Sequence, residues 1–267
     1  MPERSSYPVW LNSAFYHKLY QKEDEEDAKD FLFQLIKRLD TPAGCRMLDI
    51  GCSRGKKSKT LASLGFEVTG IDLSPGNINH AKQFESENLQ FFIHDIRRPF
   101  WINYFDHAFC LAGLGYYDTR REYEDVIRTI AGSLKPGAWL IMDQPNIHYA
   151  EEHLLHNETK KIDDTIFTIH RWDDEMYFYE KMIITDPSLN EREEHTIKKL
   201  KFSLGDLTDM LAYHGLQVQQ VFGNYEFSEY HIQRSPRLIL IAREKSNDPE
   251  DEAKRLYSDG RTTDALT

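Results

Sequence analysis

The stretch Met47–Gly55, with the sequence MLDIGCSRG, decides the fold of this 267-residue chain. Its apolar half predicts a short buried strand that runs into a glycine-punctuated turn, and residues 56–64 then have the pattern of a helix. Glycines in such a turn let the backbone approach a ligand closely, and the free N–H groups at the start of the helix point toward it. We therefore predict an α/β domain that binds a small molecule at the carboxyl end of this strand.

The spacing of the turn indicates which ligand it binds. A dinucleotide-binding turn has the spacing G-x-G-x-x-G, whereas this chain has Asp49, Gly51, Ser53 and Gly55 at alternate positions. An acid therefore stands two residues before the first glycine. We expect Ser53 to be tolerated in the turn, since its backbone need not be left-handed.

A second acid follows at the end of the next strand. Residues 66–71 predict another buried strand, which ends at Asp72. A carboxylate in this place can accept hydrogen bonds from both ribose hydroxyls of an adenosine. The alternative role is structural, because Asp72 could cap the helix that begins at Ser74 and Pro75.

Composition and charge exclude several classes of function. The chain has 33 Lys and Arg against 44 Asp and Glu, a formal net charge of -11, and no basic run, so we do not expect nucleic acid as a partner. No apolar stretch reaches about 18 residues and the first residues lack the apolar run of a signal peptide, so we expect a cytoplasmic protein without membrane contact. Three cysteines in or beside predicted strands favour reduced thiols.

The hydrophobic pattern changes after residue 143. Strands alternate with helices before it, whereas residues 165–172, 176–185 and 193–202 alternate polar with apolar, which predicts antiparallel strands. We therefore divide the chain into three parts: an α/β core of residues 1–143 and 203–245 with an N-terminal helical flap, an antiparallel insertion at 144–202 that covers the substrate side, and an acidic tail at 246–267.

Five segments, taken in order, resemble one family. These are MLDIGCSRGKKS, GFEVTGIDLSPGNINHAKQF, FFIHDIRRPF, NYFDHAFCLAGLGYY and LKPGAWLIMD. They are similar in order and spacing to the class I S-adenosylmethionine (SAM) methyltransferases, in particular to a small-molecule-type bacterial branch, over about residues 10 to 245. The departures are Ser53 in place of glycine, two lysines at 56–57 and a less aromatic stretch at 111–114.

The resemblance implies a fold, a cofactor and a reaction. The fold is a Rossmann-like seven-stranded sheet of order 3-2-1-4-5-7-6 with strand seven antiparallel, and here an antiparallel β insertion follows strand five. The cofactor is SAM. The reaction is transfer of the methyl group of SAM to a nitrogen or oxygen of a small-molecule acceptor by direct in-line displacement. The resemblance therefore implies a SAM-dependent methyltransferase.

Cofactor-binding residues follow from the resemblance and the turn. In the family an acid after strand three reaches the adenine amino group and the next apolar residue packs on the ring, and Asp95 and Ile96 fit these positions. The aromatic stripe of residues 14–20 either packs in the core or closes over the cofactor as a flap. The full candidate set is Asp49, Gly51, Cys52, Ser53, Gly55, Asp72, Leu73, Asp95, Ile96 and Leu111, with Tyr16 and Tyr20 from the flap.

Acceptor-binding residues are sought on the loops expected near the sulfonium and on the insertion. The candidates are Tyr116, Tyr117, His148, Arg171, Trp172, Tyr225 and Tyr230. None of them is assigned as a general base. We expect no metal, because His148 does not align with His153 and His156 on a helix.

Three alternatives stay open. The insertion could form a homodimer contact instead of an acceptor pocket, because alternating strands leave an edge that another chain can pair with. The altered glycine turn would also suit a SAM-binding module without catalysis. An NAD-dependent oxidoreductase shares the fold class, but the spacing of the turn argues against it.

Overall fold

The computed structural model describes residues 7–20, 27–111 and 113–245. Its larger sheet contains β1 (Arg46–Ile50), β2 (Glu67–Asp72), β3 (Leu89–Ile93), β4 (Phe105–Cys110), β5 (Leu134–Pro145), β10 (Leu216–Phe222) and β11 (Arg237–Glu244). Its smaller sheet contains β6 (Asn157–Ile162), β7 (Thr165–Asp173), β8 (Tyr177–Thr185) and β9 (Glu193–Leu200). The helices are α1 (Tyr7–Leu11), α2 (Ala14–Tyr20), α3 (Asp27–Arg38), α4 (Lys56–Ser63), α5 (Pro75–Ala81), α6 (Arg120–Ser133), α7 (Ile147–Glu152) and α8 (Leu204–Tyr213), with a 3₁₀ turn at Lys82–Phe84.

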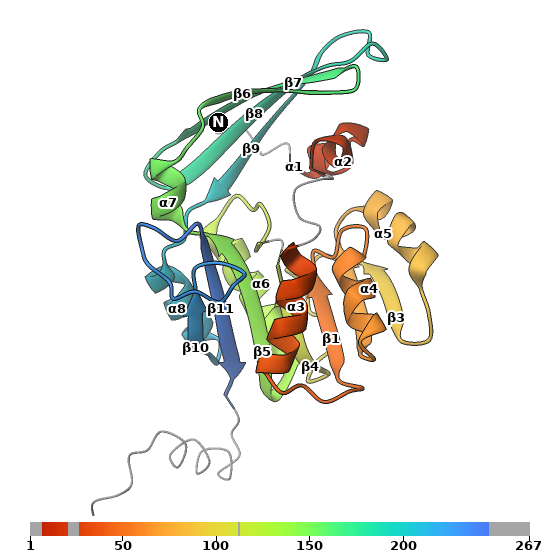
Figure 1. Cartoon of the computed structure of the whole chain (residues 1–267), viewed down its shortest axis with the longest axis vertical. Helices are drawn as coiled ribbons and strands as arrows, with labels where there is room; N and C mark the ends of the chain where they lie inside the picture. Colours follow the sequence, from red (N-terminus) through yellow and green to blue (C-terminus); the bar gives the residue numbers. More distant parts are fainter. Residues whose placement is uncertain (1–6, 21–26, 112, 246–267) are drawn as a thin grey trace, which may run out of the picture.

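The larger sheet has the order β10-β11-β5-β4-β1-β2-β3. The pairs from β3 to β5 are parallel, whereas β11 runs antiparallel to both β5 and β10. The predicted order is confirmed, with β10 and β11 as the sixth and seventh core strands. Strand β1 lies inside the sheet, so its carboxyl end is flanked by those of β2 and β4 (Figure 1).

Helices cover both faces of this sheet, which explains why its strands are nearly continuous apolar runs. Successive side chains of β1 point to opposite faces, so Met47 and Leu48 belong to different hydrophobic clusters. Met47 packs in the cluster that contains residues of α3, α4 and α5, and Leu48 in the cluster that contains residues of α6 and α8.

The smaller sheet stands above the carboxyl ends of the core strands (Figure 1). One of its faces shares a third apolar cluster with α1 and α2, which includes Trp10, Leu19, Phe167 and Ile197. The antiparallel insertion is therefore confirmed. The sequence predicted three strands, and the structure adds β6, which pairs with β7. Strand β6 was missed because NETKKI carries charged residues and has one large apolar side chain.

One part of the sequence prediction, the acidic tail at 246–267, falls outside the described residues. Among the described residues, no helix is both long and apolar enough to span a membrane. Cys45, Cys52 and Cys110 are free thiols, in agreement with the expectation.

The turn after β1 departs from one expectation. Ser53 has a φ of 51°, between Gly51 at 67° and Gly55 at 80°, so all three residues adopt a left-handed backbone. The assumption that Ser53 needs no left-handed backbone is wrong, and its tolerance in the turn stays a prediction. Gly55 has a second constraint, because a Cβ there would stand 2.6 Å from the Phe91 ring.

We predict that Ser53→Gly stabilises the protein by up to about 1 kcal/mol. A left-handed backbone costs a residue with a Cβ roughly 1–2 kcal/mol in the folded protein, and glycine does not have this cost. Glycine also raises the conformational entropy of the unfolded chain, which offsets about 0.5–1 kcal/mol of the gain. Ser53→Val should instead destabilise it by about 1 kcal/mol or more, because a β-branched residue fits this region poorly. Urea unfolding of the three proteins measures the difference, and a glycine variant less stable than the parent would contradict the argument.

A buried histidine gives a pH-dependent prediction. His107 lies inside β4, neither ring nitrogen has a hydrogen-bond partner among the described residues, and burial lowers its pKa from 6.5 to about 4. As the pH falls, the imidazole of His107 therefore binds a proton near pH 6.5 in the unfolded chain but only near pH 4 in the folded chain. The contribution of His107 to stability is intact above pH 6.5 and is lost as the pH falls toward 4, by about 3 kcal/mol in all.

The measurement compares the unfolding free energy of the parent and of His107→Leu between pH 7.5 and 4.5. The difference between the two curves should grow in favour of the variant as the pH falls, since other titrating groups are common to both. Parallel curves would show that His107 is protonated in the folded protein.

Candidate functional site

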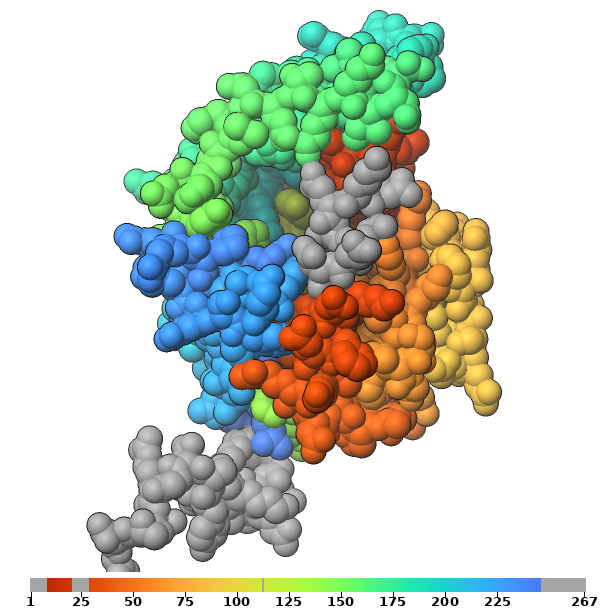
Figure 2. Space-filling model, in the orientation of Figure 1, coloured from red at the N-terminus to blue at the C-terminus, as the bar shows by residue number. Residues whose placement is uncertain are grey.

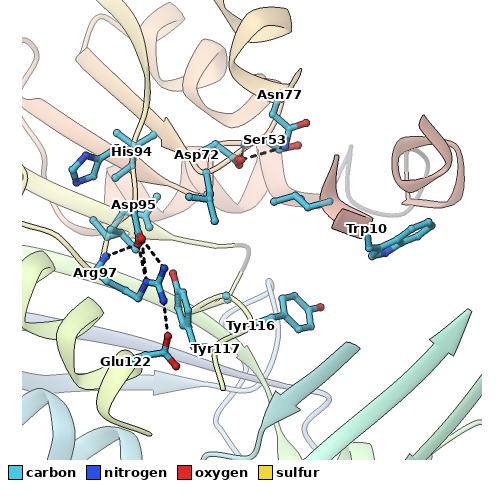
Figure 3. Close-up of a pocket in the computed structure, with 18 of the residues that line it drawn as sticks. Trp10, Ser53, Asp72, Asn77, His94, Asp95, Arg97, Tyr116, Tyr117 and Glu122 are labelled. Carbon is cyan, nitrogen blue, oxygen red and sulfur yellow. Dashed lines mark hydrogen bonds and ion pairs between the residues drawn. The ribbon is translucent and has the colours of Figure 1, made fainter. Parts of the chain in front are cut away.

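A cavity of about 380 Å³ lies where the carboxyl ends of the core strands meet the N-terminal helices and the smaller sheet. Figure 3 shows the polar and aromatic side chains that point into it. The lining residues come from four parts of the chain: Trp10, Leu11, Tyr16 and Tyr20; Ile50, Gly51, Ser53, Ile71, Asp72, Leu73 and Asn77; His94, Asp95, Ile96, Arg97, Gly113, Gly115, Tyr116, Tyr117, Asp118 and Glu122; and Ile197.

The turns after β1 and β2 are tied together at Asp72. Its Oδ2 accepts a hydrogen bond from the Ser53 N–H at 2.9 Å, and its Oδ1 accepts from the Ser74 N–H at 2.8 Å and from Nδ2 of Asn77 at 3.3 Å. Burial raises the pKa of Asp72, and these hydrogen bonds oppose that shift. Ser74 itself caps α5 by accepting from the Asn77 N–H. The alternative that Asp72 caps α5 is therefore wrong, because Ser74 is the cap; Asp72 instead connects the turn after β1 to the turn after β2, and it also borders the cavity.

The first acid of the turn has a different position. Asp49 is buried, accepts a 2.5 Å hydrogen bond from the Ser58 hydroxyl, and does not line the cavity. Burial raises its pKa. Its contact with Ser58 connects β1 to α4. Cys52, Gly55 and Leu111 are likewise absent from the cavity wall, and Cys52 and Leu111 belong to the apolar cluster beneath α3 and α4.

The end of β3 carries an ion-pair chain. Arg97 donates to both oxygens of Asp95, at 3.0 Å to Oδ1 and 2.7 Å to Oδ2, and to Glu122 at 2.5 Å. The hydrogen bond from Arg97 lowers the pKa of Asp95. Glu122 also closes the capping box of α6 with Thr119. The sequence interpretation missed Arg97 and Glu122, although the T-x-x-E spacing at 119–122 marks the start of this helix.

The N-terminal helices form an aromatic wall opposite the turns. Trp10 makes edge contacts with Tyr16 and Tyr20, whose centroids lie 5.7 and 6.3 Å away. The Tyr20 hydroxyl donates to Oε1 of Glu180 at 2.8 Å, which links α2 to the smaller sheet. The packing of this stripe is confirmed, and Tyr16 and Tyr20 also line the cavity, whereas closure over the cofactor stays a prediction. No sequence pattern indicated Trp10, because the packing of α1 against β9 is what brings it to the cavity wall.

The candidate acceptor residues divide into two groups. Tyr116 and Tyr117 line the cavity, and burial raises the pKa of each. The other five do not line it: His148, Arg171, Trp172, Tyr225 and Tyr230. Tyr225 donates to Asp143 and Tyr230 to Asn146, so both hydroxyls support the strand ends behind the cavity.

Arg171 and Trp172 occupy opposite faces of β7. Arg171 pairs with Glu158 at 2.9 Å and Glu180 at 2.5 Å. Trp172 is 41% exposed and stacks on Tyr179 at 5.2 Å. Adjacent residues of a strand point to opposite sides, so Trp172 faces away from the apolar cluster that the sheet shares with α1 and α2. The expectation that both side chains serve one pocket is wrong.

The described residues contain no group of three His, Cys, Asp or Glu side chains placed to hold a metal ion. The polar groups of the cavity are instead carboxylates, an arginine, amides and tyrosine hydroxyls. Such a mixture suits an organic ligand with several hydrogen-bonding groups.

Comparison with known proteins agrees with this arrangement. Residues 48–142 match the family model described as "Methyltransferase domain". The chain is 28% identical over 215 residues to "Putative methyltransferase YqeM" of Bacillus subtilis (strain 168), covering 75% of this chain and 85% of that protein.

Solved structures share the fold. A SAM-dependent methyltransferase from Clostridium acetobutylicum ATCC 824 superposes with a TM-score of 0.74 at 17% identity, covering 91% of this chain and all of that one. The sugar N-methyltransferase KedS8 from Streptoalloteichus sp. ATCC 53650 has a TM-score of 0.67 at 15% identity, covering 87% and 92%. The family match shows a methyltransferase domain at residues 48–142, and the strand order and the solved structures show the class I methyltransferase fold; together these similarities support a SAM-dependent methyltransferase with SAM as its cofactor.

Proposed function

We propose that this enzyme transfers the methyl group of SAM to a nitrogen or oxygen of a small molecule by direct in-line displacement. The observation that carries the proposal is a cavity in which the turns after β1 and β2 face an aromatic wall from α1 and α2, beside Ile197 of β9. Polar groups suited to bind the cofactor and aromatic groups suited to bind an acceptor therefore border the same cavity.

The residues present fit the cofactor. The cavity volume is within the range of small-molecule sites, about 300–1,000 Å³. The buried Nε1 of Trp10 has no partner among the described residues, and a buried indole N–H usually has one. An acceptor atom of a bound ligand would satisfy it.

Individual residues have distinct roles in this proposal. A carboxylate offers about four lone-pair sites, and three donors already use Asp72, so its Oδ2 keeps one for a ribose hydroxyl. Asp95, held in place by Arg97, would accept from the adenine amino group while Ile96 packs on the ring. Gly51 and Ser53 would lie against the methionine part, and Leu73 against the adenosine. Tyr16 and Tyr20 would close over the cofactor.

The chemistry asks little of the protein beyond placement. SAM supplies a methyl group on a positively charged sulfur, which leaves as a neutral thioether. Trp10, Tyr16 and Tyr20 line the same cavity as Asp72, and in this proposal their rings would exclude water from it. Tyr116 and Tyr117 border the same space and align an acceptor with the methyl group, and alignment of this kind supplies much of the rate.

The insertion is proposed as the acceptor side. Figure 2 shows the molecule hollowed between the smaller sheet and the segment around residues 223–235. Ile197 of β9 brings the sheet to the cavity itself. The similar protein KedS8 is named a sugar N-methyltransferase, which supports an acceptor of small-molecule size. The absence of a basic run argues against nucleic acid as the acceptor. The alternative use of the exposed edge strand β6, a homodimer contact, is tested by light scattering.

We predict that Asp72→Ala weakens SAM binding by about 1.5–3 kcal/mol, because a ribose hydroxyl loses a charged acceptor. It should also lower the unfolding free energy by about 1–3 kcal/mol, since the Ser53 and Ser74 N–H groups lose their acceptor. Calorimetry with SAM measures the first effect, and urea unfolding the second.

The matched control is Asp163→Ala in the turn between β6 and β7, where the side chain is 82% exposed. This variant should bind SAM as the parent does. A folded Asp72→Ala protein with unchanged SAM affinity would leave Asp72 with its structural role alone.

A further inference from the structure

Lys199 is a half-buried lysine beside the cavity, and the proposed function does not use it. It lies on β9 two residues after Ile197, so both side chains point to the same face of the smaller sheet. Its Nζ is 3.2 Å from the point that a Cβ of Gly113 would occupy, and Gly113 lines the cavity. The amide of Gln144 lies within 3.6 Å of the same point. The amine and the amide thus converge on Gly113, which lines the cavity, while neither of their own side chains is part of its wall.

In the part of the chain that the structure describes, the amine of Lys199 forms no ion pair. Among the described residues, no carboxylate lies within 4 Å of its Nζ, which Asp143 on β5 influences only from a longer distance. Oδ2 of Asp143 already accepts from the Tyr225 hydroxyl at 2.7 Å and from Arg237 at 2.6 Å.

The remaining neighbours of Lys199 do not offset the cost of burying its ammonium form. Lys199 also faces the thiol of Cys110 on β4, Arg237 on β11 and the ring of Tyr116, whose centroid is 5.6 Å from Nζ. Burial dominates these interactions and lowers the pKa of Lys199 to about 8. The neutral amine, which can accept a proton, is therefore well populated at mildly alkaline pH.

Two polar atoms of β5 in the neighbourhood of Lys199 lack hydrogen-bond partners among the described residues. Oδ1 of Asp143 and Nε2 of Gln144 are buried and make no hydrogen bond among the described residues. Asp143 is 2% exposed and Gln144 4%. Buried polar atoms of native proteins are nearly always satisfied, so this pair indicates a site for a ligand group that both donates and accepts hydrogen bonds.

We propose that Lys199 is the general base for methyl transfer and that the acceptor is an acidic hydroxyl, a phenol or an enol, held between Lys199, Gln144 and Tyr116. This proposal rests on the proposed function and assigns the reacting group of the acceptor. A hydroxyl suits the site because it can donate one hydrogen bond and accept others.

The proposed step balances as follows. The acceptor hydroxyl gives its proton to the neutral Nζ of Lys199, which becomes an ammonium group. The oxygen electron pair forms the bond to the methyl carbon, and the electron pair of the broken carbon–sulfur bond stays on sulfur. The ammonium group then returns the proton to water. No oxidant, reductant or metal takes part.

Electrostatics favours an oxygen acceptor over an amine. A protonated amine that approaches Lys199 would also come under the influence of the Arg237 guanidinium, which already acts on Lys199, and like charges repel at short distance. A phenolate would be attracted by both. A base with a pKa of about 8 also lies within about two pKa units of an ordinary phenol near 10.

The first experiment uses 4-nitrophenol as a probe and S-adenosylhomocysteine to fill the cofactor site. At a pH where the free phenol is mostly protonated, binding to the parent protein should increase the phenolate absorbance. Lys199→Met should abolish this increase, whereas Lys199→Arg should keep part of it because the positive charge remains. Lys181→Met is the matched control, since Lys181 pairs with Glu194 on the other face of the sheet. No increase with the parent protein would overturn the proposal.

The second experiment measures methyl transfer from SAM to a panel of simple phenols and a panel of primary amines. With the parent protein, the rate with phenols should rise with pH and level off above about 8, because Lys199 must be neutral to accept the proton. Lys199→Met and Lys199→Arg should both lose about 100-fold or more in kcat. Transfer to amines only, transfer to neither panel, or an unchanged pH profile in Lys199→Met would overturn the proposal.

Calorimetry with SAM separates this proposal from the proposed function. Lys199→Met should bind SAM within about threefold of the parent, less than 1 kcal/mol. A parent protein that does not bind SAM would contradict the proposed function itself. A parent that binds SAM but fails the phenolate test contradicts only the assignment of Lys199 and of the acceptor.

Discussion

The hydrogen bond from the Ser53 N–H to Asp72 fixes the two turns on which the cavity depends. It joins the turn after β1 to the turn after β2, and a second bond from the Ser74 N–H extends the link to α5. Parallel pairing alone brings the strand ends together, but it does not set the conformation of the loops that follow them. A buried carboxylate with three donors does, because each unsatisfied donor would cost about 1–3 kcal/mol.

The other half of the cavity comes from parts of the chain far apart in sequence. Trp10, Leu19 and Phe167 share one apolar cluster, so α1, α2 and the smaller sheet behave as a single packed cover. The bond between Tyr20 and Glu180 adds a polar link inside this cover. Movement of the sheet would therefore carry the aromatic wall with it. The acceptor side and the cofactor side of the proposed site are in this way mechanically connected.

The sequence was sufficient for the sheet, because buried parallel strands are continuous apolar runs and their connections are restricted. It failed where tertiary packing decides. The placement of Trp10 depends on how α1 meets β9, and the left-handed backbone of Ser53 follows from the turn between its two glycines. The assignment of Arg171 and Trp172 to one pocket was avoidable, because adjacent residues of a strand point to opposite faces of the sheet.

The contrast between Arg171 and Lys199 shows why residue type alone does not identify a functional cation. Both are basic residues in strands of the smaller sheet, and both are desolvated. Arg171 is held by Glu158 and Glu180, which raise its pKa and fix it as a structural ion pair. Lys199 has no such partner among the described residues, so burial shifts its pKa in the opposite direction. The sequence pattern favoured Arg171 and did not indicate Lys199, because the difference lies in which carboxylates the register of β7, β8 and β9 brings alongside each side chain. Strand register is therefore the property that leaves one of these two side chains able to exchange a proton.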